Sequence, residues 1–132
     1  MKERGGGSII NIASMYGIVG GYPAVYEGLP RGSPPHYHAL KGGVISLTKQ
    51  LAVNWAGHNI RVNCISPGPF PHESANPSTE ERESHRRLCE RVPLRRIGKP
   101  PELKGALLLL ASNAGSYITG HNLVVDGGWT AW

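Results

Sequence analysis

Three short segments rich in branched apolar residues alternate with longer segments of helical periodicity, and this order most constrains the fold. The predicted strands cover 8–14, 60–66 and 122–126. Between them, apolar residues recur at three- and four-residue steps over 35–57 and again over 101–112. Strand, helix, strand, helices, strand is the order of right-handed crossovers in a parallel sheet. The sequence therefore predicts an α/β fold, a doubly wound parallel sheet with flanking helices.

Two further segments complete the predicted organisation. A polar helix is expected from Ser78 to Arg91, because Ser78 followed by Glu81 is a helix-capping pattern. The glycines and prolines of 17–35 are too frequent for a regular element and predict a long irregular loop. A chain of 132 residues predicts one domain. Sheets usually have about 5 to 6 strands, so the first strand is expected to need a neighbour that the sequence does not encode.

Composition excludes several classes of protein. No stretch approaches about 20 consecutive apolar residues, so no membrane span is expected. The first residues have no apolar core like that of a secretory signal, and a cytoplasmic location is the simplest interpretation. The net charge is +5, but the basic residues are spread from Lys2 to Lys104 instead of forming one tract. Nucleic-acid binding is therefore not predicted.

The cysteines and histidines give no sign of a metal site. Cys64 and Cys89 form no CxxC pair and have no histidine at a ligand spacing, which predicts two ordinary thiols. His36, His38 and His72 are likewise without partners at a recognised spacing. The sequence therefore predicts no metal and no disulfide.

The residues with the clearest chemical meaning are Tyr37 and Lys41, which stand four positions apart on one face of the predicted helix. A nearby cation stabilises a phenolate, so this pairing suits a phenol that exchanges protons. Alone, the spacing favours an ordinary surface pair on the helix. Ser14 ends the first predicted strand and Pro67-Gly68 ends the second, at the same carboxyl edge of the sheet. A hydroxyl, a phenol and a lysine there form an acid/base set for carbonyl reduction or alcohol oxidation.

With these motifs, the sequence resembles the short-chain dehydrogenase/reductase family over nearly its whole length. The strand ending at Ser14, the Tyr37–Lys41 helix start, the 61–68 strand with its proline-glycine turn, and Asp126-Gly127-Gly128 carry the resemblance. It implies that Tyr37 is the general acid/base, Ser14 orients the carbonyl, and Lys41 stabilises the phenolate and binds the nicotinamide ribose. The cofactor would be NAD or NADP.

The resemblance also implies a partial Rossmann-like domain. Pro67, Gly68, Pro69 and Phe70 would flank the nicotinamide, together with Tyr37 and Lys41 as cofactor-binding residues. The family's glycine-rich, pyrophosphate-binding turn has no counterpart here, because Gly5-Gly6-Gly7 precedes a strand instead of following one. Residues 1–132 therefore correspond to the family's C-terminal catalytic half, a single partial NAD(P)-binding domain without the N-terminal glycine-rich half.

The segment between Ser14 and Tyr37 is longer than is usual in the family, which makes 17–35 an inserted loop beside the substrate. Ser14, Tyr16 and His72 are the predicted substrate-contacting residues, with His72 or Ser74 in place of a threonine that often binds the carboxamide. Further polar residues of this loop are Tyr22, Tyr26, Glu27 and Arg31. They suit a sugar-acid-like or other polar alcohol or carbonyl substrate. A loop that packs at a subunit interface is an equal alternative.

Two functions remain open from sequence. The first is an NAD(P)-dependent oxidoreductase that interconverts an alcohol and a carbonyl. The second is a truncated, non-catalytic module that acts only in oligomerisation. The resemblance predicts a homo-oligomer formed through the helix beginning near Tyr37 and through the last helix and strand.

Overall fold

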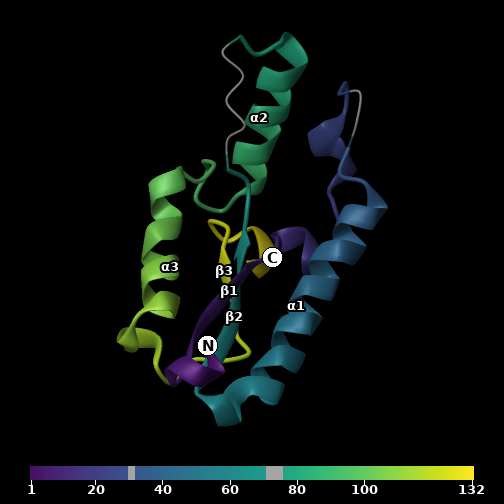
Figure 1. Cartoon of the computed structure of the whole chain (residues 1–132). Coiled ribbons are helices and arrows are strands. Elements are labelled where there is room, and N and C mark those ends of the chain that lie inside the picture. The colour runs from purple at the N-terminus through teal and green to yellow at the C-terminus, as the bar shows by residue number, and fades with distance from the viewer. Residues whose placement is uncertain (30–31, 71–75) are drawn as a thin grey trace.

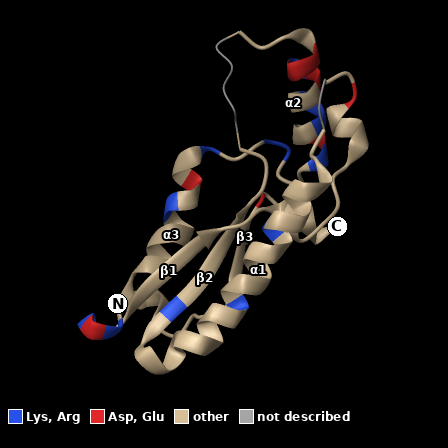
Figure 2. Cartoon of the chain, turned by 45° about the vertical axis from the view of Figure 1, so that its right-hand side comes forward, with Lys and Arg blue, Asp and Glu red and all other residues tan. Residues whose placement is uncertain are grey.

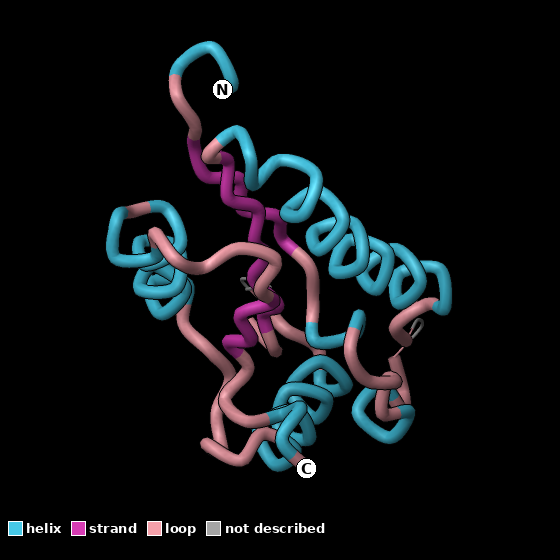
Figure 3. Tube along the Cα trace, turned by 90° about the horizontal axis from the view of Figure 1, so that it is seen from below, coloured by secondary structure: helices cyan, strands magenta, loops and turns pink. Residues whose placement is uncertain are grey.

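The computed structural model describes residues 1–29, 32–70 and 76–132, and its regular elements alternate as the sequence predicts. In the described residues, three strands and three α-helices form the framework: β1 (Gly7–Ile12), α1 (Pro35–Trp55), β2 (Ile60–Pro67), α2 (Thr79–Arg91), α3 (Lys104–Ala111) and β3 (Asn122–Val125). In the view of Figure 3, the N-terminus and the C-terminus lie on opposite sides of the molecule.

The strands form one parallel sheet in the order β1-β2-β3. Gly7 pairs with Ile60 at one end of the first ladder, and Ile12 pairs with Ile65 at the other. Helix α1 covers one face of the sheet and α3 the other (Figure 1). This arrangement confirms the predicted doubly wound α/β fold, because covering both faces of a parallel sheet buries its apolar side chains.

All three predicted strand ends were wrong by one or two residues, and the third strand ends at Val125 instead of Asp126. The first strand ends at Ile12, and Ser14 instead caps a single helical turn at Met15–Gly17. The second strand includes Pro67, which was expected to lie beyond it. Proline is tolerated there because the amides of Cys64 and Gly68 point towards β3, so the nitrogen of Pro67 belongs to the side of β1, which has already ended.

The helices follow their predicted signals closely. Ser78 Oγ accepts a hydrogen bond from the Glu81 amide, and the Glu81 carboxylate accepts one from the Ser78 amide, which confirms the capping box of α2. The apolar segment after Pro100 begins as a single turn at Pro100–Leu103 before α3 continues it. The predicted loop 17–35 is not wholly irregular, because Pro23–Tyr26 forms a helical turn with proline at its start.

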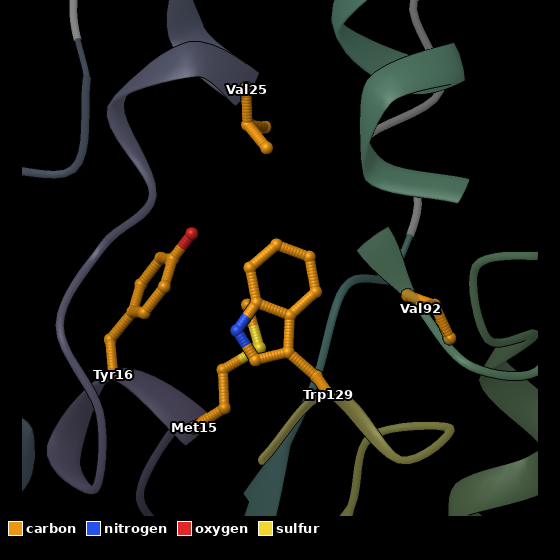
Figure 4. Packing of buried hydrophobic residues seen from close by; sticks show 5 residues of the cluster. All are labelled: Met15, Tyr16, Val25, Val92 and Trp129. Atoms are coloured by element: carbon orange, nitrogen blue, oxygen red, sulfur yellow. The ribbon is translucent and has the colours of Figure 1, made fainter. Parts of the chain in front are cut away.

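Apolar residues are buried in two clusters. Ala52, Ile60 and Val62 pack between α1 and the sheet. The second cluster consists of Met15, Tyr16, Val25, Val92 and Trp129. Its side chains come from segments far apart in sequence and converge on Trp129 (Figure 4). The second cluster is what ties the segments that follow β1, α2 and β3 to one another.

Buried polar groups fix the chain as it enters β3. Asn63 is fully buried, its Nδ2 donates to the Ile118 carbonyl at 2.8 Å, and its Oδ1 accepts from the His121 amide at 3.0 Å. Arg61 donates to the carbonyls of Leu110 and Ser112 at the end of α3. These bonds satisfy backbone groups that regular structure leaves unpaired.

One edge of the sheet is open. Among residues 1–29, 32–70 and 76–132, β1 pairs only with β2, and the side chain of Ile12 is half exposed. This agrees with the expectation that the first strand needs a further neighbour. No helix in the described part of the chain is long and apolar enough to cross a membrane.

Replacing Asn63 with Ala should lower the free energy of unfolding by about 2 kcal/mol, because the part-buried Ile118 carbonyl and His121 amide would each lose the hydrogen bond that Asn63 provides. Urea unfolding followed by circular dichroism measures the effect. Asn54→Ala is the matched control, since Asn54 is exposed on α1 and accepts only from Gln50. Equal midpoints for the two variants would contradict the assigned role of Asn63.

Candidate active site

Ser14 lies just beyond the carboxyl end of β1 and is almost fully buried, at 7% exposure. The amide of Ala13 still donates to the Ile65 carbonyl at 2.8 Å, so the chain stays in the plane of the sheet up to this residue. Ser14 Oγ accepts a hydrogen bond of 3.2 Å from the Tyr16 amide. The hydroxyl oxygen is thereby oriented while its own proton stays available to a further acceptor.

Tyr37 and Lys41 lie one turn apart near the start of α1. Lys41 Nζ is 5.7 Å from the centroid of the Tyr37 ring. The same ammonium donates to the Ile12 carbonyl at 2.8 Å, so it joins α1 to the last residue of β1. An ammonium has three protons, and two remain for other acceptors. The structure thus brings Lys41 to the strand end that Ser14 follows.

A close backbone contact makes this arrangement possible. A Cβ atom built on Gly17 would lie 2.7 Å from the carbonyl carbon and oxygen of Lys41, closer than real Cβ atoms approach. The turn that follows Ser14 therefore rests directly on the backbone of α1. Gly42 of α1 faces this turn, because a Cβ atom built on it would lie 3.6 Å from the Gly17 carbonyl oxygen, whereas Gly43 has open space around it.

The proline-glycine turn lies at the same edge of the sheet, after β2. The Gly68 amide donates to the Val125 carbonyl at 2.9 Å, and a Cβ atom on Gly68 would lie 2.5 Å from Asp126 Cα. Only glycine lets the ends of β2 and β3 approach this closely. Pro69 and Phe70 then line a small cavity of about 110 Å³ beside Asp126.

Tyr16 and Tyr26 form a second phenol pair beside the site. Their hydroxyl oxygens are 2.6 Å apart, and the ring of Tyr16 stacks on that of His38 at 4.7 Å between centroids. Burial, and secondly the hydrogen bond with Tyr26, raises the pKa of Tyr16 well above its ordinary value. Tyr16 therefore stays protonated at neutral pH and is a hydrogen-bonding group rather than an acid or base.

An open groove of about 520 Å³ lies between the 17–35 segment and the start of α1. Tyr26, Ser33 and His38 contribute polar atoms to its wall. Sequence reasoning considered His38 only as a metal ligand and missed its position in this groove. The sequence feature that could have indicated a place for His38 in this groove was its position next to Tyr37.

Charged residues concentrate on α2 (Figure 2), and one of them fastens this helix to the segment that follows β1. Arg87 Nη1 donates to the carbonyls of Ala24 and Glu27 at 2.9 and 3.1 Å, while its Nε donates to Glu83. The loop and the helix are therefore joined by hydrogen bonds between residues about sixty positions apart in sequence.

The structure thus groups most of the predicted site residues at one edge of the sheet. Ser14, Tyr16, Tyr37 and Lys41 gather where β1 meets α1. At the same edge, Pro67 ends β2 and is followed by Gly68, Pro69 and Phe70. His72, Ser74 and Arg31 lie outside the described residues. Among the residues that are described, no group of three or more His, Cys, Asp or Glu side chains is placed to hold a metal ion.

Comparison with known proteins identifies the family. A family model described as enoyl-(acyl carrier protein) reductase matches residues 1–130. The chain belongs to the short-chain dehydrogenase/reductase family. The resemblance noted in the sequence is thereby confirmed.

Three relatives show which members it is similar to. The 2-dehydro-3-deoxy-D-gluconate 5-dehydrogenase of Dickeya dadantii is 37% identical over 99% of this chain and 48% of its own length. The galactitol 2-dehydrogenase of Cereibacter sphaeroides, an L-tagatose-forming enzyme, is 39% identical over 100% of this chain and 49% of its own. A crystal structure of a gluconate 5-dehydrogenase from Burkholderia cenocepacia, in complex with NADP and tartrate, superposes with a TM-score of 0.81 at 36% identity and covers 99% of this chain and 48% of that one. The chain thus spans about half the length of the relatives it matches.

Within this short-chain dehydrogenase/reductase chain, Gly17→Ala should lower stability by roughly 2 kcal/mol, because the new methyl group forces the turn away from the α1 backbone. Thermal unfolding measures the change. Gly20→Ala is the control, since a Cβ atom there meets nothing within 4 Å. A melting temperature for Gly17→Ala equal to that of the control would show that the turn does not depend on this contact.

Proposed function

We propose that this chain carries the catalytic edge of an NAD- or NADP-dependent oxidoreductase that interconverts an alcohol and a carbonyl. The observation that supports it most is the position of Lys41, whose ammonium lies 5.7 Å from the Tyr37 ring and donates to the last residue of β1. The Tyr37 phenol and the Lys41 cation are therefore proposed to act near the end of β1. The Ser14 hydroxyl follows two residues after Ile12, the last residue of that strand. These are the groups that acid/base chemistry on a carbonyl requires.

Each side chain has a distinct role in the proposal. Ser14, whose oxygen is engaged by the Tyr16 amide, donates its proton to the substrate oxygen and orients it. Tyr37 gives a proton to that oxygen when a carbonyl is reduced and takes it back when an alcohol is oxidised. Lys41 stabilises the phenolate that remains. When bound, the nicotinamide cofactor supplies or accepts the hydride.

The residues present fit the nicotinamide end of such a cofactor. Tyr37 and Lys41 would bind the ribose, since Lys41 keeps two donor protons beyond its bond to Ile12. Pro67, Gly68, Pro69 and Phe70 would flank the ring at the edge of the sheet. The pyrophosphate end is different, because Gly5-Gly6-Gly7 leads into β1 and opens no helix. We therefore propose that residues 1–132 form a single partial NAD(P)-binding domain and that the glycine-rich turn is provided from outside them.

The proposed substrate is a polyhydroxy alcohol or a sugar acid. The relatives named above are dehydrogenases of gluconate derivatives and of galactitol, which supports a polar substrate of this size. Ser14 and Tyr16 are the described residues proposed to contact it, and His72 remains a third. The paired phenols of Tyr16 and Tyr26 suit substrate hydroxyls, because a phenol both donates and accepts hydrogen bonds.

A second function, as an oligomerisation module, is favoured by a different observation. Leu40 and Leu47 are 61% and 51% exposed and lie seven positions apart on α1, so they share one face of the helix. An exposed apolar stripe of this kind marks a protein contact. A homo-oligomer formed through this face is compatible with catalysis, whereas a purely structural module would bind no cofactor.

Tyr37→Phe should reduce NAD- or NADP-linked oxidation of gluconate or galactitol by at least about 100-fold, because the substrate proton has no other acceptor of this type. The assay follows formation of the reduced cofactor. Tyr117→Phe is the matched control, since Tyr117 is fully exposed and its hydroxyl has no recorded partner in the described chain. A Tyr37→Phe protein as active as this control would refute the assigned role.

A fluorescence titration with NADH and NADPH, run beside gel filtration, separates the two candidate functions. Saturable binding supports the enzyme. A folded oligomer that binds neither cofactor would overturn the catalytic proposal for this chain and leave the oligomerisation module.

A further inference from the structure

Arg91, the last residue of α2, is surrounded by aromatic rings. Its guanidinium carbon lies 5.4 Å from the ring centroid of Tyr22, 5.6 Å from that of Trp129 and 5.2 Å from that of Trp132. The rings come from the segment after β1 and from the segment after β3. Three distant parts of the chain therefore converge on this one cation.

Among the described residues, Arg91 has no anionic partner, unlike Arg86 and Arg87 on the same helix. Arg86 pairs with Glu83 and Glu90, and Arg87 pairs with Glu83 and two backbone carbonyls. For Arg91, the described residues provide neither a hydrogen bond nor an ion pair, and its Nε atom is buried without an acceptor. A partly buried guanidinium in this state lacks the counter-charge that buried cations normally have.

Aromatic rings stabilise a guanidinium in a way that suits anion binding. They attract the cation through their π-systems but accept none of its in-plane N–H groups. Those groups match the two oxygens of a carboxylate in a planar, bidentate arrangement. The rings therefore hold Arg91 in place, and the two terminal nitrogens of the guanidinium, which are not buried as Nε is, are the donors proposed to meet an acid.

The position of Arg91 connects it with the candidate active site. Trp129 is buried in the cluster that also contains Tyr16 (Figure 4). Tyr37 packs against the same cluster. Tyr22 and Trp132 are 50% and 60% exposed, so this aromatic surround is open towards solvent. Arg91 itself is only partly buried, so its side chain lies at the margin of this cluster.

We propose that Arg91 binds the carboxylate of the substrate and selects acids over neutral polyols of the same length. This inference rests on the proposed function, since it names the substrate class of that site. It addresses a choice that the relatives leave open, because they include both a gluconate derivative and galactitol among their substrates. A planar donor set favours the acid through hydrogen bonds that a terminal alcohol cannot replace.

The test uses the tryptophans as reporters, because two of the three in the chain, Trp129 and Trp132, flank Arg91. The purified chain is titrated with sodium gluconate and with sorbitol, its neutral counterpart, at ionic strength held constant with sodium chloride. Gluconate should give a saturable change in emission with an apparent Kd at least about tenfold lower than that for sorbitol. Equal responses to gluconate, sorbitol and chloride would overturn the proposal.

Variants of two arginines on α2 test whether Arg91 is responsible for the preference for gluconate over sorbitol. Arg91→Gln should weaken gluconate binding at least about tenfold and leave the weak sorbitol response unchanged. Arg82→Gln is the matched control, because it removes the same charge from an exposed position on α2. Arg91→Lys, which keeps the charge but not the planar donors, should fall between them, and it decides the matter if Arg91→Gln does not fold. Wild-type gluconate affinity in the Arg91 variants would refute the assignment.

These titrations contain no cofactor and require no turnover. Failure of the proposed oxidoreductase chemistry would appear in the NADH titration and the Tyr37→Phe assay, whereas failure of the Arg91 assignment would appear only in the gluconate titrations. The two proposals can therefore fail separately.

Discussion

The backbone contact between Gly17 and α1 is the constraint on which the candidate site depends. With no side chain at Gly17, the turn after β1 rests on the helix at Lys41, and Lys41 reaches the Ile12 carbonyl in return. This holds the end of β1 and the start of α1 at a fixed separation. Ser14 and Tyr37 are then positioned by rigid elements on either side of one contact, which is what acid/base chemistry needs from a scaffold.

The tyrosines of the loop are supported differently from the groups proposed to act on a substrate. Tyr37 and Lys41 belong to a long helix packed on the sheet, whereas Tyr16, Tyr22 and Tyr26 belong to the segment between β1 and α1. That segment is held by Arg87 through two backbone carbonyls and by packing around Trp129. Changes in this segment can therefore alter the substrate without disturbing the strand end at Ser14. Such separation of scaffold from loops is common in enzymes of this architecture.

Sequence patterns predicted the elements well because their signals are local. The periodicity of α1, the capping box at Ser78 and the apolar runs of β2 and β3 each operate within a few residues. The tyrosine and lysine were found for the same reason, since a four-residue spacing fixes their shared face. The contacts of Arg87 with Ala24 and of Arg91 with Trp132 join distant segments and leave no local trace. Gly17 illustrates the limit: its sequence context indicated a break in the chain, and only the structure shows that it permits a backbone contact.

The unpaired side of β1 has a consequence for handling the molecule. Along Gly7–Ile12, every second residue directs its amide and carbonyl away from β2, and apolar side chains such as Ile12 stand beside them. A strand in this state is a template on which a further strand from any source can assemble, including one from an identical chain. The six residues Gly7–Ile12 are therefore the margin of the sheet at which self-association through an added strand is to be expected.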